Sequence, residues 1–430
     1  MMLSGVVASR WQTNSYDVDT RPTIVTMTLD AVAVSNSDWR AELSSMDIPL
    51  AVSTDNVTLE CLETLISTGR LTFDQGVRLM VNPNLNSVTS LADMVKKARF
   101  QDFVFFNENL HVNSTNVCVL ACRFCAFRKG PRHPDAYSLS VNEYLERVRP
   151  YATRIDEVHT VGGLHPTWTV AEYCELFSNL KNEFPHIHIK ALTAVEIKHL
   201  SSRSSLSFSE TLSRLSEAGL NSLPGGGAEI LVDSVRDRIC MGKESSDEYL
   251  EIHGVAHSLG IPTNCTMLFG TVESIEDRIN HLLRLREQQD ESLGFQCFVP
   301  YPFLPDKTRL PEAQLATGQE IIRMISVSRL MLDNIPHIKA YRMNIGDKLA
   351  SYAINCGADD VDGTVGHEEI MHEAGSKTSL TTSSEQLARM VVSSGAIPVK
   401  RNSTYSQFEI VDPPEGKPSH FLPVITVEVP

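Results

Sequence analysis

Short apolar segments alternate with amphipathic stretches along the centre of the chain. The apolar segments have the length of buried strands and lie at 157–161, 187–192, 221–223, 263–269 and 294–301. Helical stretches lie between them and open with a capping box, a Ser or Thr followed three residues later by Glu. The boxes begin at Ser140, Thr169, Ser207 and Ser245, and Ser274 with Asp277 is a weaker variant. This alternation with short loops predicts parallel strand pairing.

Two glycines and two further apolar segments extend the pattern. Gly219 and Gly260 stand where a helix would end just before the next strand, as C′ residues do. Candidate strands at 338–343 and 359–364 would raise the number of strands to eight. At least six units in one direction favour an α/β fold of the (β/α) barrel type, although an open sheet would show the same periodicity. In such barrels the chemistry lies at the C-terminal ends of the strands.

Apolar spacing before the barrel predicts helices within 58–80, broken near Gly69, and over 87–97. We therefore expect a helical N-terminal cap at 51–103, a barrel core at 104–345 and a C-terminal segment at 346–430 that completes or covers the barrel. Residues 1–50 read as a poorly ordered extension, in which Met46 is an alternative start.

Charge and hydropathy limit the partners of the chain. The formal net charge of −15 over 430 residues disfavours nucleic acid as the main partner, because phosphate binding needs a basic surface. No apolar run approaches the roughly 18 residues that span a bilayer, and the N-terminal residues lack the order of a signal peptide. A small-molecule substrate and no membrane partner are expected.

Nine cysteines in a chain of this length do not make a disulfide scaffold. Six are scattered and are expected to be small buried hydrophobes: Cys61, Cys174, Cys240, Cys265, Cys297 and Cys356. A reducing cytoplasm suits such thiols.

The remaining three cysteines form a compact motif. Cys118, Cys122 and Cys125 follow a candidate strand at 110–113 and have the spacing Cys-x3-Cys-x2-Cys, with no fourth cysteine nearby. Three thiolates can hold three irons of a 4Fe–4S cluster and leave the fourth iron open. The alternative is a zinc-binding interaction module, which would need a fourth ligand, and His133 is poorly placed for it. Phe124 and Phe127 would shield a cluster from water.

Two glycine-rich loops follow candidate strands. The paired Gly162 and Gly163 allow close backbone approach, so main-chain groups could bind the ammonium or carboxylate of a cofactor; the alternative is a tight turn. The run Gly225, Gly226 and Gly227 can form an anion-binding nest, and the alternative is a flexible linker. Neither loop matches the dinucleotide fingerprint.

Acidic residues also follow candidate strands. Glu196 could accept hydrogen bonds from ribose hydroxyls, or could be a solvated acid at a helix start, and Glu273 has the same two interpretations. The acids at 359, 360 and 362 resemble a divalent-metal loop, but the other EF-hand ligands are absent. We expect these acids at the rim of the barrel mouth.

These motifs together resemble the radical S-adenosylmethionine superfamily and, within it, the aminodeoxyfutalosine synthase family of menaquinone biosynthesis. The resemblance rests on 113–118, 122–127, 158–166, 190–196, 223–229, 329–337 and 357–364. Several motifs are shared with the cyclic dehypoxanthine futalosine synthases and the deazaflavin (FO) synthases, whereas 191–196 and 359–364 favour the first family. Two departures are residues 1–50, which have no counterpart, and Leu164, which replaces the acidic residue common after the glycine pair.

The resemblance implies a transferase. Cys118, Cys122 and Cys125 would ligate the 4Fe–4S cluster, and S-adenosylmethionine would be the co-substrate. Its 5′-deoxyadenosyl radical would add to 3-[(1-carboxyvinyl)oxy]benzoate and give 6-amino-6-deoxyfutalosine, methionine and bicarbonate, whereas the sister enzymes abstract hydrogen. Cofactor contacts would come from Gly162, Gly163, Glu196, Gly225, Gly226 and Gly227. An arginine such as Arg342 or Arg309 would bind a substrate carboxylate, and flavodoxin or ferredoxin would donate the electron.

Overall fold

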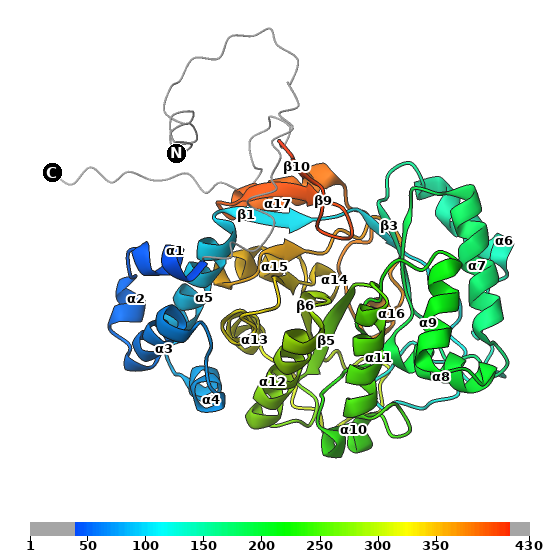
Figure 1. Cartoon of the computed structure of the whole chain (residues 1–430), viewed down its shortest axis with the longest axis horizontal. Helices are drawn as coiled ribbons and strands as arrows, with labels where there is room; N and C mark the ends of the chain where they lie inside the picture. Colours follow the sequence, from blue (N-terminus) through cyan, green and yellow to red (C-terminus); the bar gives the residue numbers. More distant parts are fainter. Residues whose placement is uncertain (1–38, 413–430) are drawn as a thin grey trace, which may run out of the picture.

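The structure, a computed structural model, describes residues 39–412 (Figure 1). The N-terminal extension predicted over 1–50 is contradicted from Trp39 onward, and residues 1–38 lie outside the described part. Helix α1 spans Trp39–Ser45 and buries Trp39 and Leu43, which stand on one helix face at i and i+4. This burial makes α1 part of the helical cap.

Parallel strands form the centre of the molecule. One sheet contains β2 (Asn109–His111), β3 (Glu157–Thr160) and β4 (His188–Ala191). The other contains β5 (Thr263–Phe269), β6 (Phe295–Pro302), β7 (His337–Ala340), β8 (Asp360–Val361), β1 (Phe103–Phe106), β9 (Ile397–Arg401) and β10 (Phe408–Ile410). Every strand pair is parallel except β9 with β10.

The two sheets join into a closed ring. On one side Ser222 bridges Lys190 and Leu223 bridges Thr263, so the predicted strand at 221–223 contributes isolated parallel bridges between β4 and β5. On the other side Thr364, beyond β8, bridges Asn109 of β2. The ring therefore has eight strand positions, and the predicted (β/α) barrel is confirmed.

Three strands were not predicted, and one ends early. β1 pairs with β8 on one edge and with β9 on the other, so the C-terminal hairpin β9–β10 extends the sheet beside the barrel. The strand predicted at 338–343 stops at Ala340, because helix α14 (Arg342–Ile345) begins two residues later.

Helices surround the barrel and cap it. The cap, drawn in blue in Figure 1, contains α1, α2 (Leu50–Ser53), α3 (Asn56–Thr68), α4 (Phe73–Val81) and α5 (Leu85–Phe100). The barrel helices are α6 (Val141–Val148), α7 (Val170–Glu183), α8 (Ala194–Ser204), α9 (Phe208–Glu217), α10 (Asp233–Ile239), α11 (Ser246–Ser258), α12 (Ile275–Ser292) and α13 (Gly318–Met331). The C-terminal segment adds α15 (Asp347–Ala353), α16 (Ile370–Glu373) and α17 (Ser384–Ser393), and short 3₁₀ turns occupy Arg149–Tyr151 and Ile354–Cys356.

Local capping signals were read correctly. The capping boxes at Ser140, Thr169, Ser207, Ser245 and Ser274 are all present and start α6, α7, α9, α11 and α12. Each such cap contributes about 1 kcal/mol. Gly219 and Gly260 follow α9 and α11 with φ of 118° and 73°, the left-handed backbone that a C′ glycine supplies.

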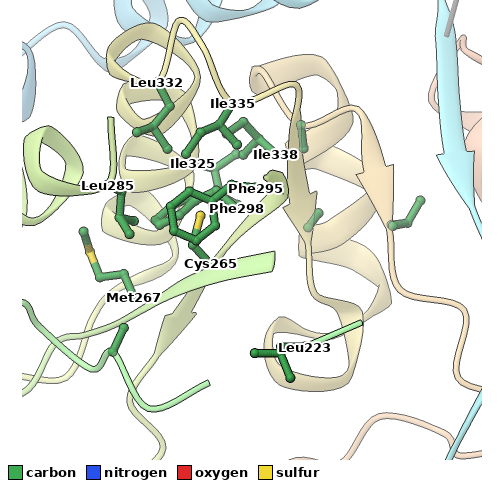
Figure 2. Close-up of a cluster of buried hydrophobic side chains, with 14 of the residues drawn as sticks. Leu223, Cys265, Met267, Leu285, Phe295, Phe298, Ile325, Leu332, Ile335 and Ile338 are labelled. Atoms are coloured by element: carbon green, nitrogen blue, oxygen red, sulfur yellow. The ribbon is translucent and has the colours of Figure 1, made fainter. Parts of the chain in front are cut away.

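Apolar side chains fill the space between the strands and the helices. Figure 2 shows Cys265, Met267 and Phe298 from β5 and β6 packed with residues of α12, α13 and β7. All nine cysteines are free, and five of the six scattered ones are buried as predicted, while Cys174 is half-buried. No helix in residues 39–412 meets the length and hydropathy needed to cross a membrane.

Candidate active site

One cavity of about 260 Å³ opens where the barrel strands end. Its wall contains all three motif cysteines, Cys118, Cys122 and Cys125, and the loops that follow β3 and β4. Gly226 and Gly227 of the triple-glycine run also line it. Segments more than a hundred residues apart in sequence therefore converge, as expected at the C-terminal face of a barrel.

Backbone hydrogen bonds hold the cysteine loop, residues 118–125, both at its N-terminal end and to the last residue of α10. The Cys118 amide donates to the Lys129 carbonyl at 3.0 Å, and the Lys129 amide donates to the Asn116 carbonyl at 2.8 Å. The Arg123 amide donates to the Ile239 carbonyl at 2.8 Å. These backbone contacts hold the three thiols at the wall of the cavity.

Burial governs the chemistry of the thiols. It raises the pKa of Cys122 to about 12, against the opposing influence of the Lys243 ammonium, and it also raises the pKa of Cys125. Metal binding at such thiols must displace their protons. Phe124 and Phe127 line the cavity together with the three cysteines, and their shielding of a cluster stays a prediction.

The donor set fits a 4Fe–4S cluster. Within residues 39–412 there is no group of three or more His, Cys, Asp or Glu side chains that could hold a metal ion. Cluster thiolates bind three different irons and need no common point of convergence. His133, the fourth ligand considered for zinc, is exposed, and its Nδ1 accepts a hydrogen bond from the Asp135 amide at 3.1 Å.

The glycine pair packs against the chain that leads into the cysteine loop. A Cβ on Gly163 would lie 2.3 Å from the Val117 carbonyl oxygen, so no larger residue fits there without a backbone shift. Gly163 donates to the Thr115 carbonyl at 2.8 Å and is not part of the cavity wall. Gly162 is in the wall, but its amide donates to Glu196 Oε1 at 2.9 Å.

Glu196 lies behind the wall. Its Oε2 accepts from the amide and hydroxyl of Thr193 at 2.8 and 2.6 Å, which completes the capping box of α8. Burial raises its pKa to about 7, although these hydrogen bonds oppose the shift. Glu196 therefore ties the loop after β3 to the start of α8, and its predicted contact with ribose stays a prediction. The sequence pattern Thr193-x-x-Glu196 is a capping box and could have indicated that Glu196 caps helix α8.

The triple-glycine run is pinned rather than flexible. Gly225 has φ of 83°, and a Cβ there would lie 2.2 Å from the Asn264 carbonyl oxygen. The Gly225 carbonyl accepts from the Tyr249 hydroxyl at 2.7 Å, so Gly225 itself does not line the cavity. Gly227 has φ of 102°, and a Cβ there would lie 2.9 Å from Glu244 Oε1. These contacts require glycine at both positions.

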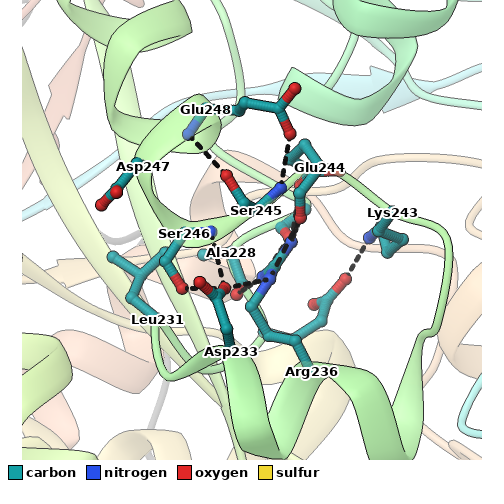
Figure 3. A network of polar contacts seen from close by, with 12 residues as sticks. Ala228, Leu231, Asp233, Arg236, Lys243, Glu244, Ser245, Ser246, Asp247 and Glu248 are labelled. Atoms are coloured by element: carbon teal, nitrogen blue, oxygen red, sulfur yellow. Dashed lines mark hydrogen bonds and ion pairs between the residues drawn. The ribbon is translucent and has the colours of Figure 1, made fainter.

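A buried ion network behind this run was not anticipated (Figure 3). Lys243 pairs with Glu229, and both residues line the cavity. Burial opposes the charge on Lys243, but Glu229 and Glu244 raise its pKa nonetheless. Arg236 holds Glu244 at 3.2 Å and donates to its carbonyl at 2.5 Å. No motif marks these residues, because their pairing depends on the turn after α10.

Several predicted polar residues lie away from the cavity. Arg342 binds Asp347 at 2.7 Å, and Arg309 donates to the Ala121 carbonyl of the cysteine loop at 2.7 Å, so neither lines the wall. Glu273 is buried and accepts from the Gly270 amide at 2.6 Å and from Arg278 at 2.8 Å.

The acids placed at the barrel rim by prediction are instead buried inside, which corrects that expectation. Asp359 and Asp360 belong to a charged floor beneath the cavity, defined as Glu157, Lys190, Arg329, His337, Lys339, Asp359, Asp360 and Arg401. Asp362 is not part of this group and accepts from the Thr364 hydroxyl at 2.9 Å. Asp360 pairs with Lys339 at 2.7 Å and with Arg401 at 2.6 Å, and Lys190 pairs with Glu157 at 2.7 Å. The partners of these acids come from other strands and from helix α13, so the sequence did not reveal that these acids could be buried.

Helix α16 covers one side of the cavity. Its residues Ile370 and Met371 line the wall. Glu369 accepts from the Tyr137 hydroxyl at 2.5 Å and pairs with Arg147 at 3.2 Å. These contacts tether the C-terminal segment to the chain that follows the cysteine loop.

Known proteins share this sequence and this architecture. The radical SAM superfamily matches residues 112–285, and the CofH/MqnC C-terminal region matches residues 292–413. The chain is 39% identical to the aminodeoxyfutalosine synthase of Thermus thermophilus, covering 80% of this chain and 94% of that protein. It is 38% identical to the protein of the same name from Streptomyces coelicolor, covering 82% and 95%.

Two further matches place the chain more broadly. A 5-amino-6-(D-ribitylamino)uracil–L-tyrosine 4-hydroxyphenyl transferase of Methanoculleus marisnigri is 36% identical, over 81% of this chain and 96% of that protein. The crystal structure of methylornithine synthase superposes with a TM-score of 0.63 at 19% identity, over 78% of this chain and 96% of that one. At that identity the likeness concerns the fold alone.

Proposed function

The chain belongs to the radical S-adenosylmethionine superfamily, in the group that contains the aminodeoxyfutalosine synthases, and from this premise we propose that it is such a synthase. It joins the 5′-deoxyadenosyl group of S-adenosylmethionine to 3-[(1-carboxyvinyl)oxy]benzoate. The products are 6-amino-6-deoxyfutalosine, methionine and bicarbonate, in the futalosine route to menaquinone.

One observation supports the proposal most strongly. Three free thiols on a clamped loop share one cavity with Gly162, Gly226 and Gly227 from loops after other strands. Cys118, Cys122 and Cys125 would hold the 4Fe–4S cluster. When bound, the cluster and S-adenosylmethionine supply a 5′-deoxyadenosyl radical.

The residues of this chain supply confinement. A carbon radical takes a nearby hydrogen atom unless the alkene lies within near-attack distance, roughly 3–3.5 Å. Phe124 and Phe127 line the cavity on the cysteine side and exclude water there, and Met371 of α16 lines it from the C-terminal segment. Gly226 and Gly227 let the backbone approach a ligand closely, because they carry no side chain.

An external protein must deliver the electron. We propose a flavodoxin or ferredoxin for this role and a cytoplasmic location, since nine free cysteines suit a reducing compartment.

Anaerobic incubation of the reconstituted protein tests the proposal. With S-adenosylmethionine, a reductant and 3-[(1-carboxyvinyl)oxy]benzoate, we expect a product that retains the adenosyl unit, together with methionine. A parallel reaction with dehypoxanthine futalosine tests the sister chemistry, in which hydrogen abstraction releases 5′-deoxyadenosine. Turnover in the second reaction alone would reassign the chain to the sister group, and a colourless protein with one bound zinc would refute both.

A further inference from the structure

The cavity wall has two parts of different character. The loop part carries the cysteines, and the strand part lies below it on the barrel strands themselves. His111 of β2 and His159 of β3 stack in the strand part with ring centroids 4.4 Å apart and planes at 8°. Tyr301 of β6 and Tyr341 after β7 meet edge to face at 5.1 Å and line the same cavity.

Two polar atoms of these wall residues lack a partner. His111 Nε2 and Asn344 Oδ1 are buried and have no hydrogen-bond partner within residues 39–412. Their residues are only 5% and 8% exposed, so water outside the protein does not satisfy them. A buried unpaired polar group is costly, so a bound molecule is the natural source of the missing partner.

The surrounding charges are already neutralised by one another. Glu368, which also lines the cavity, accepts from the Met371 amide at 2.9 Å and pairs with His372 at 2.9 Å. Below the cavity the charged floor is internally paired. Burial and the neighbouring His111 hold the pKa of His159 well below its usual value, so His159 is neutral. The strand part therefore offers aromatic faces, the unpaired His111 Nε2 as a hydrogen-bond donor and the unpaired Asn344 Oδ1 as an acceptor.

We propose that the strand part binds the aromatic acid portion of the acceptor, with the ring carboxylate accepting a hydrogen bond from His111. This inference rests on the proposed function and adds the position of the substrate. Stacked and edge-on aromatic side chains suit a benzoate ring. With the ring held by the strands, the alkene points toward the loop part, where the cysteines lie. His111 is in this scheme a substrate-binding residue, and it replaces the arginines expected from the sequence.

Binding without turnover tests the assignment. The probes are 3-[(1-carboxyvinyl)oxy]benzoate and 2-phenoxyacrylate, which lacks the ring carboxylate, titrated into the reconstituted protein in the absence of reductant. We expect His111→Asn to weaken binding of the first probe about 10- to 100-fold and to leave the second within about twofold. His186→Asn is the matched control, because His186 is exposed and only contacts the Ala152 carbonyl.

His111→Phe is a second variant if His111→Asn fails to fold, because it keeps a ring against His159 and removes the ring nitrogens. Selective loss of affinity for the benzoate probe supports the subsite in either variant. An equal loss for both probes, or no loss, overturns it. A protein that makes the product but binds both probes unchanged in His111→Asn refutes this inference alone. A wild-type protein that neither binds the benzoate nor forms product refutes the proposed function.

Discussion

The cysteine loop and the charged floor lie in the same barrel, but the three thiols of the loop are free whereas the charged side chains of the floor are paired. The loop presents three free thiols to a cavity, and its contacts to the rest of the protein run through backbone groups and flanking side chains. In the floor, charged side chains meet opposite charges, as Asp359 meets Arg329 and His337 with no side-chain exposure on either acid or arginine. The loop is thus arranged for binding, and the floor for holding the strands together.

Removing one thiol of the cysteine loop should have the largest effect of the changes considered, and the effect should be on activity. Cys122→Ala should lower product formation by roughly 1000-fold or more, because the three thiolates act as one unit. The free energy of unfolding should change by no more than about 1 kcal/mol. Iron content, product assay and urea denaturation check this.

Cys174→Ala is the matched control for that experiment, since Cys174 is half-buried and only reaches the Arg214 carbonyl at 3.5 Å. It should keep iron and activity. Full activity in an iron-free Cys122→Ala protein would remove the loop from the mechanism.

Breaking the floor should act on stability instead. Asp359→Ala leaves Arg329 buried without its partner and removes the acceptor of the Ile338 amide at 2.8 Å. Loss of one partner of a buried pair costs about 3–5 kcal/mol. Urea denaturation should report this, with Asp237→Ala on the exposed side of α10 as control. An unchanged midpoint would show that the floor does not hold the barrel together.

Glu196 allows a further test, because it is a buried acid that lies beside the cavity and outside the charged floor. Its pKa is raised from 4.5 to about 7, so the folded protein holds a proton that the unfolded chain releases. The stability from this group is full below pH 4.5 and is lost as the pH rises to about 7. A pKa shift of this size corresponds to about 3 kcal/mol of the free energy of unfolding.

Glu196→Gln should flatten the pH dependence of unfolding between pH 4.5 and 7. Glu210→Gln is the matched control at the same capping-box position of α9, where the acid is exposed and its pKa is lowered. It should leave the slope in that window unchanged. A slope that survives Glu196→Gln would assign the proton to another group.

The smallest expected effect concerns the contact between the glycine pair and the cysteine loop. Gly163→Ala places a methyl group against the Val117 carbonyl and should cost about 1–3 kcal/mol by overpacking. Because Val117 precedes Cys118, iron content after reconstitution should fall as well. Gly318→Ala is the control, since a Cβ there meets nothing within 4 Å. Equal stability and iron content in both variants would show that the loop tolerates this shift.

The features that were predicted correctly from the sequence are those that depend on residues close together in the chain. A capping box such as Ser140 with Glu143 forms within one helical turn. The positive φ of Gly260 likewise depends on its place just after a helix. The spacing of the three cysteines is likewise local. The barrel followed from the alternation of these local elements.

Contacts between distant segments could not be read in the same way. The short strand β1 was missed because its partners β8 and β9 lie more than 250 residues further along the chain. Asp360 was predicted to be a rim acid because its partners Lys339 and Arg401 lie on other strands and are not adjacent to it in sequence. Lys243 carries no motif, although it pairs with Glu229 in the cavity wall.

The amino-acid sequence by itself determined the alternation of strands and helices in the barrel, the motif cysteines and the glycine-rich loops. Only the tertiary structure decided which of these loops share a cavity, that Glu196 supports the wall from behind, and that His111 stacks on His159 at its base. The physical reason is that capping and turn energies depend on adjacent residues, whereas burial and ion pairing depend on whichever segment the fold brings near.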